Sequence, residues 1–254
     1  MTPTEIATAA AAIAGARRAR SRIGALPETC RPATATDAHA IQDAVTALLD
    51  AEVGAFKANA PIGDAPGVRA PIYAPAILAS PARIDPTDCP QCGVEGEIAF
   101  RFRQDLPPRP TPYTREEVAA SVDACAAIEP VTSRFADPAA PALDKLADCL
   151  SNGGFVYGAI IEDWHRLDLA KLQVTLTVNG ETVLDQVGGH PTKDPLGAAV
   201  ALVELMRPAG GVKAGQYVTT GSCTGLRYLA PGDRCGVVFE GLGAAQLEFV
   251  APHR

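Results

Sequence analysis

Hydrophobic and polar positions along the first 53 residues follow a helical period. Residues 4–22 are rich in alanine, the strongest helix former. Residues 36–52 place apolar side chains at spacings of three and four, which is the period of a helix with one buried face. These side chains are Ile41, Val45, Leu48 and Leu49. We therefore expect residues 1–53 to form a small helical N-terminal cap.

After residue 53 the pattern changes to short extended stretches, separated by Gly, Pro, Asp and Asn. The expected strands are 53–57, 70–73, 97–103, 155–161, 172–178, 218–220, 235–239 and 245–250. Asn179-Gly180 joins one of them to a further stretch at 181–185, and Asn-Gly is typical of a two-residue hairpin turn. Residues 54–254 are thus predicted to be rich in β-structure.

Two helices interrupt the expected strands. One begins at Thr114, where Glu117 completes a capping box, and its apolar side carries Val118, Val122 and Cys125. The other covers residues 195–207. Strands outnumber helices and do not alternate regularly with them, which argues against a doubly wound sheet. The pattern favours an α+β fold, a roll of mostly antiparallel strands beside the helical cap.

Composition and charge narrow the classes of function. The 254 residues are 47% hydrophobic and carry a net charge of −7, which favours a packed core and argues against a nucleic-acid partner. The basic cluster Arg17, Arg18, Arg20 and Arg22 has the spacing of a solvated helix face. No apolar run approaches the roughly 20 residues of a membrane span. The charges around residues 7–16 also have the wrong order for a signal peptide, so we expect a cytoplasmic protein with no membrane partner.

Seven widely spread cysteines do not resemble the disulfide framework of a small secreted protein. Cys89-Pro90-Gln91-Cys92 has the spacing of a redox dithiol or of half a zinc site. However, there is no second Cys-x-x-Cys and no nearby histidine. Two thiols in a loop are therefore the favoured interpretation.

Glu95, Glu97 and Glu129 are the principal candidates for chemistry. Side chains two apart on a strand point to the same face, so Glu95 and Glu97 are expected to lie together. Spacing alone equally fits a solvated outer face. Glu129 lies between Ile128 and Pro130 in an apolar segment, where an unpaired carboxylate would be costly to bury. Three such carboxylates would suit Mg²⁺ or Mn²⁺, because hard cations prefer oxygen ligands.

Other candidates are less specific. Lys57 lies among apolar residues and could serve as an acid or base, although a snorkelling surface lysine fits equally well. Residues 219–225 are dense in hydroxyls and glycine and could bind a carboxylate, or form an ordinary turn. The four histidines, His39, His165, His190 and His253, have no metal-ligand spacing. There is no Gly-x-Ser-x-Gly, which argues against a serine hydrolase.

The order of several segments resembles the fumarylacetoacetate hydrolase superfamily. Within it, the chain is similar to the 2-keto-4-pentenoate hydratase and 4-oxalocrotonate decarboxylase branch. One departure is His39, where the branch usually has Tyr. The matching segments, which span nearly the whole length, are 37–42, 54–57, 94–100, 128–134, 147–158, 194–196, 220–222 and 232–243.

The resemblance implies a β-rich roll with Glu95, Glu97 and Glu129 around Mg²⁺ or Mn²⁺. It implies Lys57 in the active site, and Ser222 and Asn152 as substrate-binding residues. It also implies a homo-oligomer, with a complex with a related decarboxylase as a further possibility, and a role in aromatic-ring catabolism.

The expected activity is a lyase that hydrates a 2-hydroxy-2,4-dienoate to a 4-hydroxy-2-oxo acid. Three alternatives stay open at this point: a 4-oxalocrotonate-type decarboxylase, an acylpyruvate C–C hydrolase, and a non-catalytic subunit that binds a partner enzyme. The hydrolase would need a His–Glu pair, for which His39 is the nearest candidate.

Overall fold

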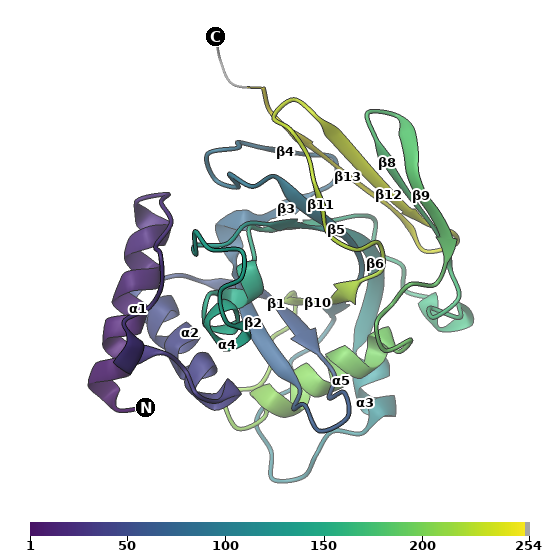
Figure 1. Ribbon diagram of the computed structural model, residues 1–254. Helices are drawn as coiled ribbons and strands as arrows, with labels where there is room; N and C mark the ends of the chain where they lie inside the picture. The colour runs from purple at the N-terminus through teal and green to yellow at the C-terminus, as the bar shows by residue number, and fades with distance from the viewer. Residues whose placement is uncertain (252–254) are drawn as a thin grey trace.

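Two β-sheets form the centre of the computed structural model, which describes residues 1–251 (Figure 1). The larger has the order β2-β1-β10-β5-β6-β7-β3, with β11 paired to β5, and the smaller has the order β4-β13-β12-β8-β9. The larger sheet consists of β1 (Val53–Asn59), β2 (Val68–Tyr73), β3 (Ile77–Ala79), β5 (Gly93–Phe102), β6 (Val122–Val131), β7 (Phe155–Tyr157), β10 (Tyr217–Ser222) and β11 (Arg227–Tyr228). The smaller consists of β4 (Ala82–Ile84), β8 (Gln173–Val178), β9 (Glu181–Val187), β12 (Arg234–Phe239) and β13 (Gly243–Phe249).

Most neighbouring strands are antiparallel, as the sequence predicts. The exceptions are the parallel pairs β1–β10, β3–β7 and β4–β13. The expected hairpin joins β8 to β9, and Asn179 and Gly180 both adopt the positive φ that its turn requires. The α+β assignment is confirmed.

The main hydrophobic core lies where the two sheets pack on each other. Strand β5 supplies Ile98, Phe100 and Phe102 to it, and strand β12 supplies Val237 and Phe239. The alternate residues of β5 point to the opposite face of the large sheet, because successive side chains of a strand alternate. That opposite face carries the carboxylates described below.

In the described part of the chain, five α-helices surround the sheets: α1 (Pro3–Arg18), α2 (Ala35–Leu49), α3 (Arg115–Ala119), α4 (Ala142–Ala147) and α5 (Pro195–Met206). Helices α1 and α2 lie together on one side of the molecule, and the small sheet lies on the other (Figure 1). No helix within residues 1–251 has both the length and the apolar character that crossing a membrane requires.

The two N-terminal helices have a hydrophobic cluster of their own. Ile13, Ile41 and Val45 are fully buried in it. Phe135, between β6 and α4, and Leu146, in α4, belong to the same cluster. Leu48, expected on the buried side of α2, is instead 44% exposed. Since the cluster includes residues from beyond position 53, the division into a 1–53 cap and a 54–254 catalytic domain stays a prediction. The end of that domain, including His253, lies outside the described residues.

The helix expected from Thr114 is shorter than predicted. Its capping box between Thr114 and Glu117 forms, but the helix ends at Ala119. Residues Val122–Val131 then form β6, which is buried along its whole length between β5 and β7. A strand covered on both faces is apolar throughout and lacks the period of two, so the pattern resembled a continuing helix.

Candidate metal centre

Three carboxylates meet on the face of the large sheet that is turned away from the main core. Glu95 lies directly opposite Glu129 on the β5–β6 pair, and Glu97 follows two residues along β5. One carboxylate oxygen from each lies within 4.8 Å of the other two. Glu97 and Glu129 are buried, at 1% and 0% exposure. The structure therefore brings together the three residues that the sequence singled out.

The residues around the carboxylates explain why this segment can hold them. Gly96, between the two glutamates, faces the other way, and a Cβ there would lie 2.8 Å from side-chain atoms of both Thr224 and Val237. Only glycine allows β5 to pack this closely. On the carboxylate face the neighbouring residues Ala99 and Ala127 are small and fully buried, in a hydrophobic cluster with Phe155 and Tyr217.

Strand β10 holds Glu97 in place. The Thr219 hydroxyl and the Gly221 amide, the latter at 2.8 Å, both donate hydrogen bonds to Glu97 Oε2. Both donors reach one oxygen because the pairing of β10 with β5 shifts between Thr219 and Ser222, as at a β-bulge. Gly221 has a φ of 116°, a conformation that favours glycine.

Glu129 is held by two side chains from other parts of the chain. The Lys57 ammonium of β1 lies 2.7 Å from Glu129 Oε2, and the Asn152 amide donates to Oε1 at 2.9 Å. Lys57 also donates to the Leu150 carbonyl oxygen at 3.2 Å. That carbonyl belongs to a turn in which Cys149, Leu150 and Ser151 all have left-handed backbone conformations.

Burial and mutual repulsion raise the pKa values of two of the carboxylates. Burial, followed by repulsion from Glu97 and Glu95, raises the pKa of Glu129 to about 8 despite the nearby lysine. Burial and Glu97 likewise raise the pKa of Glu95. Burial alone would lower the pKa of Lys57, but attraction to the three glutamates raises it overall.

One lysine cannot balance three clustered carboxylates, and a divalent cation would supply the missing charge. The donor atoms are all carboxylate oxygens, which fits a hard cation such as Mg²⁺ or Mn²⁺. The residues present therefore fit a divalent metal site, which Glu95, Glu97 and Glu129 would form.

The two residues expected to bind substrate have different surroundings. Ser222 lies opposite Glu97, and its buried hydroxyl lacks a well-formed hydrogen bond, although it is near enough to lower the pKa of Glu95. Asn152 already uses its amide to hold Glu129 and the Gly154 carbonyl. Ser222 is thus available to a ligand, whereas Asn152 is placed to orient Glu129. Their role in substrate binding stays a prediction.

Sequence reasoning missed some of the residues that support this centre. Thr219 lies in the hydroxyl-rich stretch 219–225, but its bond to Glu97 depends on the bulge in β10. His190 is buried, and its Nε2 lies 2.8 Å from the Thr220 carbonyl. Burial lowers the pKa of His190, and the hydrogen bond to Thr220 and then attraction to Glu97 partly offset this. Only the folded chain reveals this proximity.

Two other sequence candidates lie elsewhere. His39 accepts a hydrogen bond from the Arg69 amide at 3.2 Å and does not join the carboxylate cluster. Cys89 and Cys92 are buried, and the Cys89 thiol contacts the Val131 carbonyl. Among residues 1–251 these two thiols do not belong to any group of three or more side chains close enough together to hold a metal ion.

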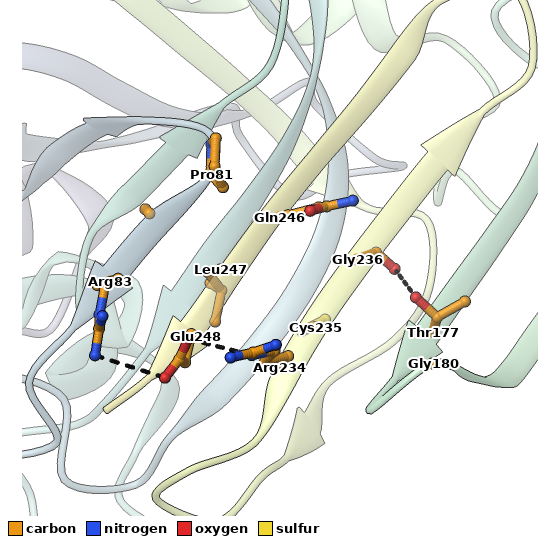
Figure 2. Close-up of a pocket in the computed structure, with 11 residues that line it drawn as sticks. Pro81, Arg83, Thr177, Gly180, Arg234, Cys235, Gly236, Gln246, Leu247 and Glu248 are labelled. Carbon is orange, nitrogen blue, oxygen red and sulfur yellow. Dashed lines mark hydrogen bonds and ion pairs between the residues drawn. The ribbon is translucent and has the colours of Figure 1, made fainter. Parts of the chain in front are cut away.

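Glu95 also lines a cavity of about 240 Å³. Val131, Leu150 and Leu226 form its apolar wall, and Lys145 also lines it. A larger hollow of about 470 Å³ lies on the small sheet (Figure 2). There the Arg83 and Arg234 side chains both pair with Glu248, and no cluster of carboxylates is present among the residues shown. The cavity of about 240 Å³ is therefore the one of these two that adjoins the carboxylate cluster.

Comparison with known proteins identifies the family. The model of the fumarylacetoacetate (FAA) hydrolase C-terminal family matches residues 52–250. The chain belongs to this family. The match covers β1 to β13, and so includes every residue of the carboxylate centre.

Two relatives have similar sequences. A protein of Comamonas testosteroni named 2-hydroxyhexa-2,4-dienoate hydratase is 36% identical over 162 residues, which cover 61% of this chain. The matched part spans only 59% of that relative's length. A 2-keto-4-pentenoate hydratase of Paraburkholderia phymatum is 32% identical over 96% of this chain and 97% of its own length.

A solved structure shares the fold. The 4-oxalocrotonate decarboxylase of Pseudomonas putida G7, complexed with magnesium and adipate, has a TM-score of 0.85 and covers 98% of this chain and 99% of that one. The sequence identity is 20%, so this similarity establishes the fold alone. It confirms the expected family fold.

Proposed function

We propose that the chain is a divalent-metal-dependent hydratase that adds water to a 2-hydroxy-2,4-dienoate and yields a 4-hydroxy-2-oxo acid. The observation that carries this proposal is the Lys57–Glu129 pair inside a cluster of three carboxylates. The cluster provides a metal site and the lysine provides an adjacent proton. The hydratase names of both relatives support the choice of reaction.

Glu95, Glu97 and Glu129 would hold Mg²⁺ or Mn²⁺, which when bound acts as a Lewis acid toward the oxygens of a 2-oxo acid. The chain's own residues keep this site in shape. Thr219 and Gly221 fix Glu97, and Asn152 fixes Glu129. The Ser222 hydroxyl, which lies beside Glu95, is placed to orient a polar group of the substrate.

The overall reaction consumes one water molecule and has two stages, and in each stage one proton leaves an oxygen and one is added to a carbon. In the first stage a proton leaves the 2-hydroxyl group and one is added at C5, which moves the double bond to C3–C4 in conjugation with the 2-ketone. In the second stage the water oxygen bonds to C4 and loses a proton, and a proton is added at C3. Lys57 holds a proton at Nζ beside Glu129 and is our candidate for proton transfer or for orienting the substrate carboxylate.

The walls of the cavity beside Glu95 bear on substrate choice. Val131, Leu150 and Leu226 offer an apolar surface that suits the short hydrocarbon end of a dienoate. Lys145 lines the same cavity and favours the second candidate, a 4-oxalocrotonate-type decarboxylase, because an ammonium could pair with the second carboxylate of a dicarboxylic substrate. An acylpyruvate hydrolase is less well supported, since His39 binds the Arg69 backbone.

The intact carboxylate cluster also argues against a non-catalytic subunit, which would not need it. We propose a homo-oligomeric enzyme of aromatic-ring catabolism, with a complex with a related decarboxylase as a further proposal.

The test is a comparison of three substrates with Mg²⁺ present: 2-hydroxypenta-2,4-dienoate, 4-oxalocrotonate and an acylpyruvate. Products are identified by NMR and mass spectrometry. The hydratase proposal predicts a gain of 18 Da, one water, with the first substrate as the preferred reaction. Preferential loss of CO₂ from the second would instead establish the decarboxylase, and C–C cleavage of the third would establish the hydrolase.

A further inference from the structure

The turn formed by residues 148–152 contacts both members of the Lys57–Glu129 pair. The Leu150 carbonyl oxygen accepts a hydrogen bond from Lys57 Nζ at 3.2 Å. Two residues further along, the Asn152 side-chain amide donates to Glu129 Oε1 at 2.9 Å. One short segment therefore helps to set the positions of the lysine and of the glutamate.

The backbone of this turn is strained. Cys149, Leu150 and Ser151 have φ values of 54°, 53° and 58°, in the left-handed region that residues with a side chain rarely adopt. A run of three such residues is costly and persists only where the surrounding contacts hold it. Contacts that stabilise the turn can therefore influence the carboxylate centre without touching it.

The Arg134 guanidinium bridges the two ends of the turn. Its Nη2 donates to the Asp148 carbonyl oxygen at 2.9 Å, and its Nη1 donates to the Asn152 carbonyl oxygen at 2.8 Å. Its Nε donates to Asp148 Oδ1 at 2.5 Å. A guanidinium is planar and carries donors on all three nitrogens, so it can serve these three acceptors at once.

The Asp148 carboxylate fixes this arginine in return. Asp148 is fully buried, and its Oδ2 accepts a hydrogen bond from the Arg134 backbone amide at 2.8 Å. Arg17 of α1, expected on a solvated helix face, has a side chain that is only 17% exposed and lies 3.6 Å from Asp148 Oδ1. The carboxylate therefore lies between two guanidinium groups, which restricts its position.

We propose that Arg134 and Asp148 are positioning residues for the carboxylate centre. They are not members of the cluster that would hold the metal. They act through the turn, in which Asn152 orients Glu129 and the Leu150 carbonyl restrains Lys57. For catalysis this inference rests on the proposed function, whereas for metal binding it requires only the three glutamates. Changing the shape of the Arg134 side chain should therefore weaken metal binding although every metal ligand is intact.

Arg134→Lys is the diagnostic variant. It keeps the positive charge beside Asp148, but an ammonium lacks the planar fork that spans three acceptors. Metal-free full-length protein is titrated calorimetrically with Mn²⁺ at a temperature at which circular dichroism shows the variant folded. We expect roughly tenfold weaker binding, the usual scale when support behind a metal ligand is lost.

Two further variants separate positioning from general destabilisation. Arg109→Lys is the matched control, because Arg109 also donates to one carboxylate and two carbonyl oxygens, those of Glu117, Thr111 and Pro112. It should lower Tm and leave the Mn²⁺ affinity unchanged. Asp148→Asn has an amide that can accept only one of the two hydrogen bonds from Arg134, and it should weaken Mn²⁺ binding as Arg134→Lys does.

A double-mutant cycle tests the route through Asn152. Arg134→Lys should lower the Mn²⁺ affinity of Asn152→Ala by less than it lowers that of the wild type, because the link to Glu129 is already gone. Additive losses, wild-type affinity in both Arg134→Lys and Asp148→Asn, or an equal loss in Arg109→Lys would overturn the proposal. No turnover is measured, so a wild type that binds Mn²⁺ but hydrates no dienoate would contradict only the proposed function.

Discussion

Lys57 Nζ lies 2.7 Å from Glu129 Oε2, at a position where the glutamate is fully buried and the lysine side chain is 14% exposed. The two residues come from β1 and β6, which are not neighbours in the sheet. Since β10 and β5 lie between β1 and β6, the two side chains meet above those strands, and the protonated Lys57 amine lies beside the Glu129 carboxylate. This pair links the stability of the fold to the chemistry of the centre.

Breaking the pair should destabilise the protein. Lys57→Met removes the ammonium that pairs with Glu129 and should lower the free energy of unfolding by about 1–3 kcal/mol, because the buried carboxyl group loses its ion-pair partner and must take up a proton. Lys57→Met combined with Glu129→Gln should be more stable than the sum of the single changes predicts. Urea unfolding of the four proteins without metal measures this coupling, and strictly additive effects would contradict it.

Glu97 should be essential for metal binding but not for folding. Glu97→Gln keeps an acceptor for Thr219 and Gly221 while it removes one charge, so the metal-free Tm should stay near or above that of the wild type. The increase in Tm on adding Mn²⁺ and the catalytic activity should both be lost. Glu162→Gln, on the exposed surface, is the control. Wild-type Mn²⁺ affinity in Glu97→Gln would exclude Glu97 as a ligand.

Asn152 should act through Glu129. Asn152→Ala removes the hydrogen bond to Glu129 Oε1 and should weaken Mn²⁺ binding by roughly 10- to 100-fold, the usual effect of losing a residue that orients a metal ligand. Calorimetric titration with Mn²⁺ gives the affinity, and circular dichroism checks the fold. If the affinity were unchanged while substrate KM rose, Asn152 would instead be a substrate-binding residue.

His39 should make the protein less stable in mild acid. Burial, followed by repulsion from Arg69, lowers its pKa from 6.5 to about 4. Between pH 6.5 and pH 4 the unfolded chain binds a proton at this imidazole that the folded chain does not. The stabilisation that comes from the neutral imidazole is therefore complete above pH 6.5 and is lost as the pH falls toward 4. Near pH 5 the free energy of unfolding should fall by at most about 1 kcal/mol for each pH unit of acidification.

The variant His39→Gln keeps an acceptor for the Arg69 amide but cannot titrate, so it should flatten the dependence of unfolding free energy on pH between 6.5 and 4. His165→Gln makes the same chemical change at an exposed position. If the unfolding free energy of His39→Gln changed with pH as steeply as that of the wild type, titration of His39 would not contribute to the pH dependence of stability.

Leu226 should influence which substrate is accepted. It is 42% exposed and lines the cavity that Glu95 also lines. Leu226→Arg adds a cation there and should raise the ratio of kcat/KM for a dicarboxylate over a monocarboxylate several-fold. Val187→Arg, on the exposed edge strand β9, is the control for added charge. An unchanged ratio would place the far end of the substrate elsewhere.

Local patterns indicated which carboxylates could lie together. Glu95 and Glu97 are brought to one face by the two-residue period of a strand, and the apolar neighbours of Glu129 indicated its burial. The apolar surroundings of Lys57 made it a candidate acid or base, and the family resemblance assigned it to the active site and added Ser222 and Asn152. The contacts that hold these side chains depend on strands far apart in sequence, such as the bulge in β10 that fixes Glu97.

Two features of the fold were not accessible from local patterns. The apolar run 122–131 has no alternation because both its faces are covered, and the neighbours that cover it come from other parts of the chain. Arg17 has the spacing of a solvated residue, but its side chain pairs with the buried Asp148 and lies over the Tyr73 ring. In both cases tertiary contacts outweigh the local signal.

The central claim is that a divalent metal at the three glutamates supports addition of water to a dienoate. A proton NMR time course with 2-hydroxypenta-2,4-dienoate tests it most directly, with Mg²⁺ in one sample and EDTA in another. We predict that 4-hydroxy-2-oxopentanoate appears with Mg²⁺, fails to appear with EDTA, and appears again when excess Mg²⁺ is restored. Folded, metal-loaded protein that leaves the dienoate unhydrated, or hydrates it equally in EDTA, would contradict the account.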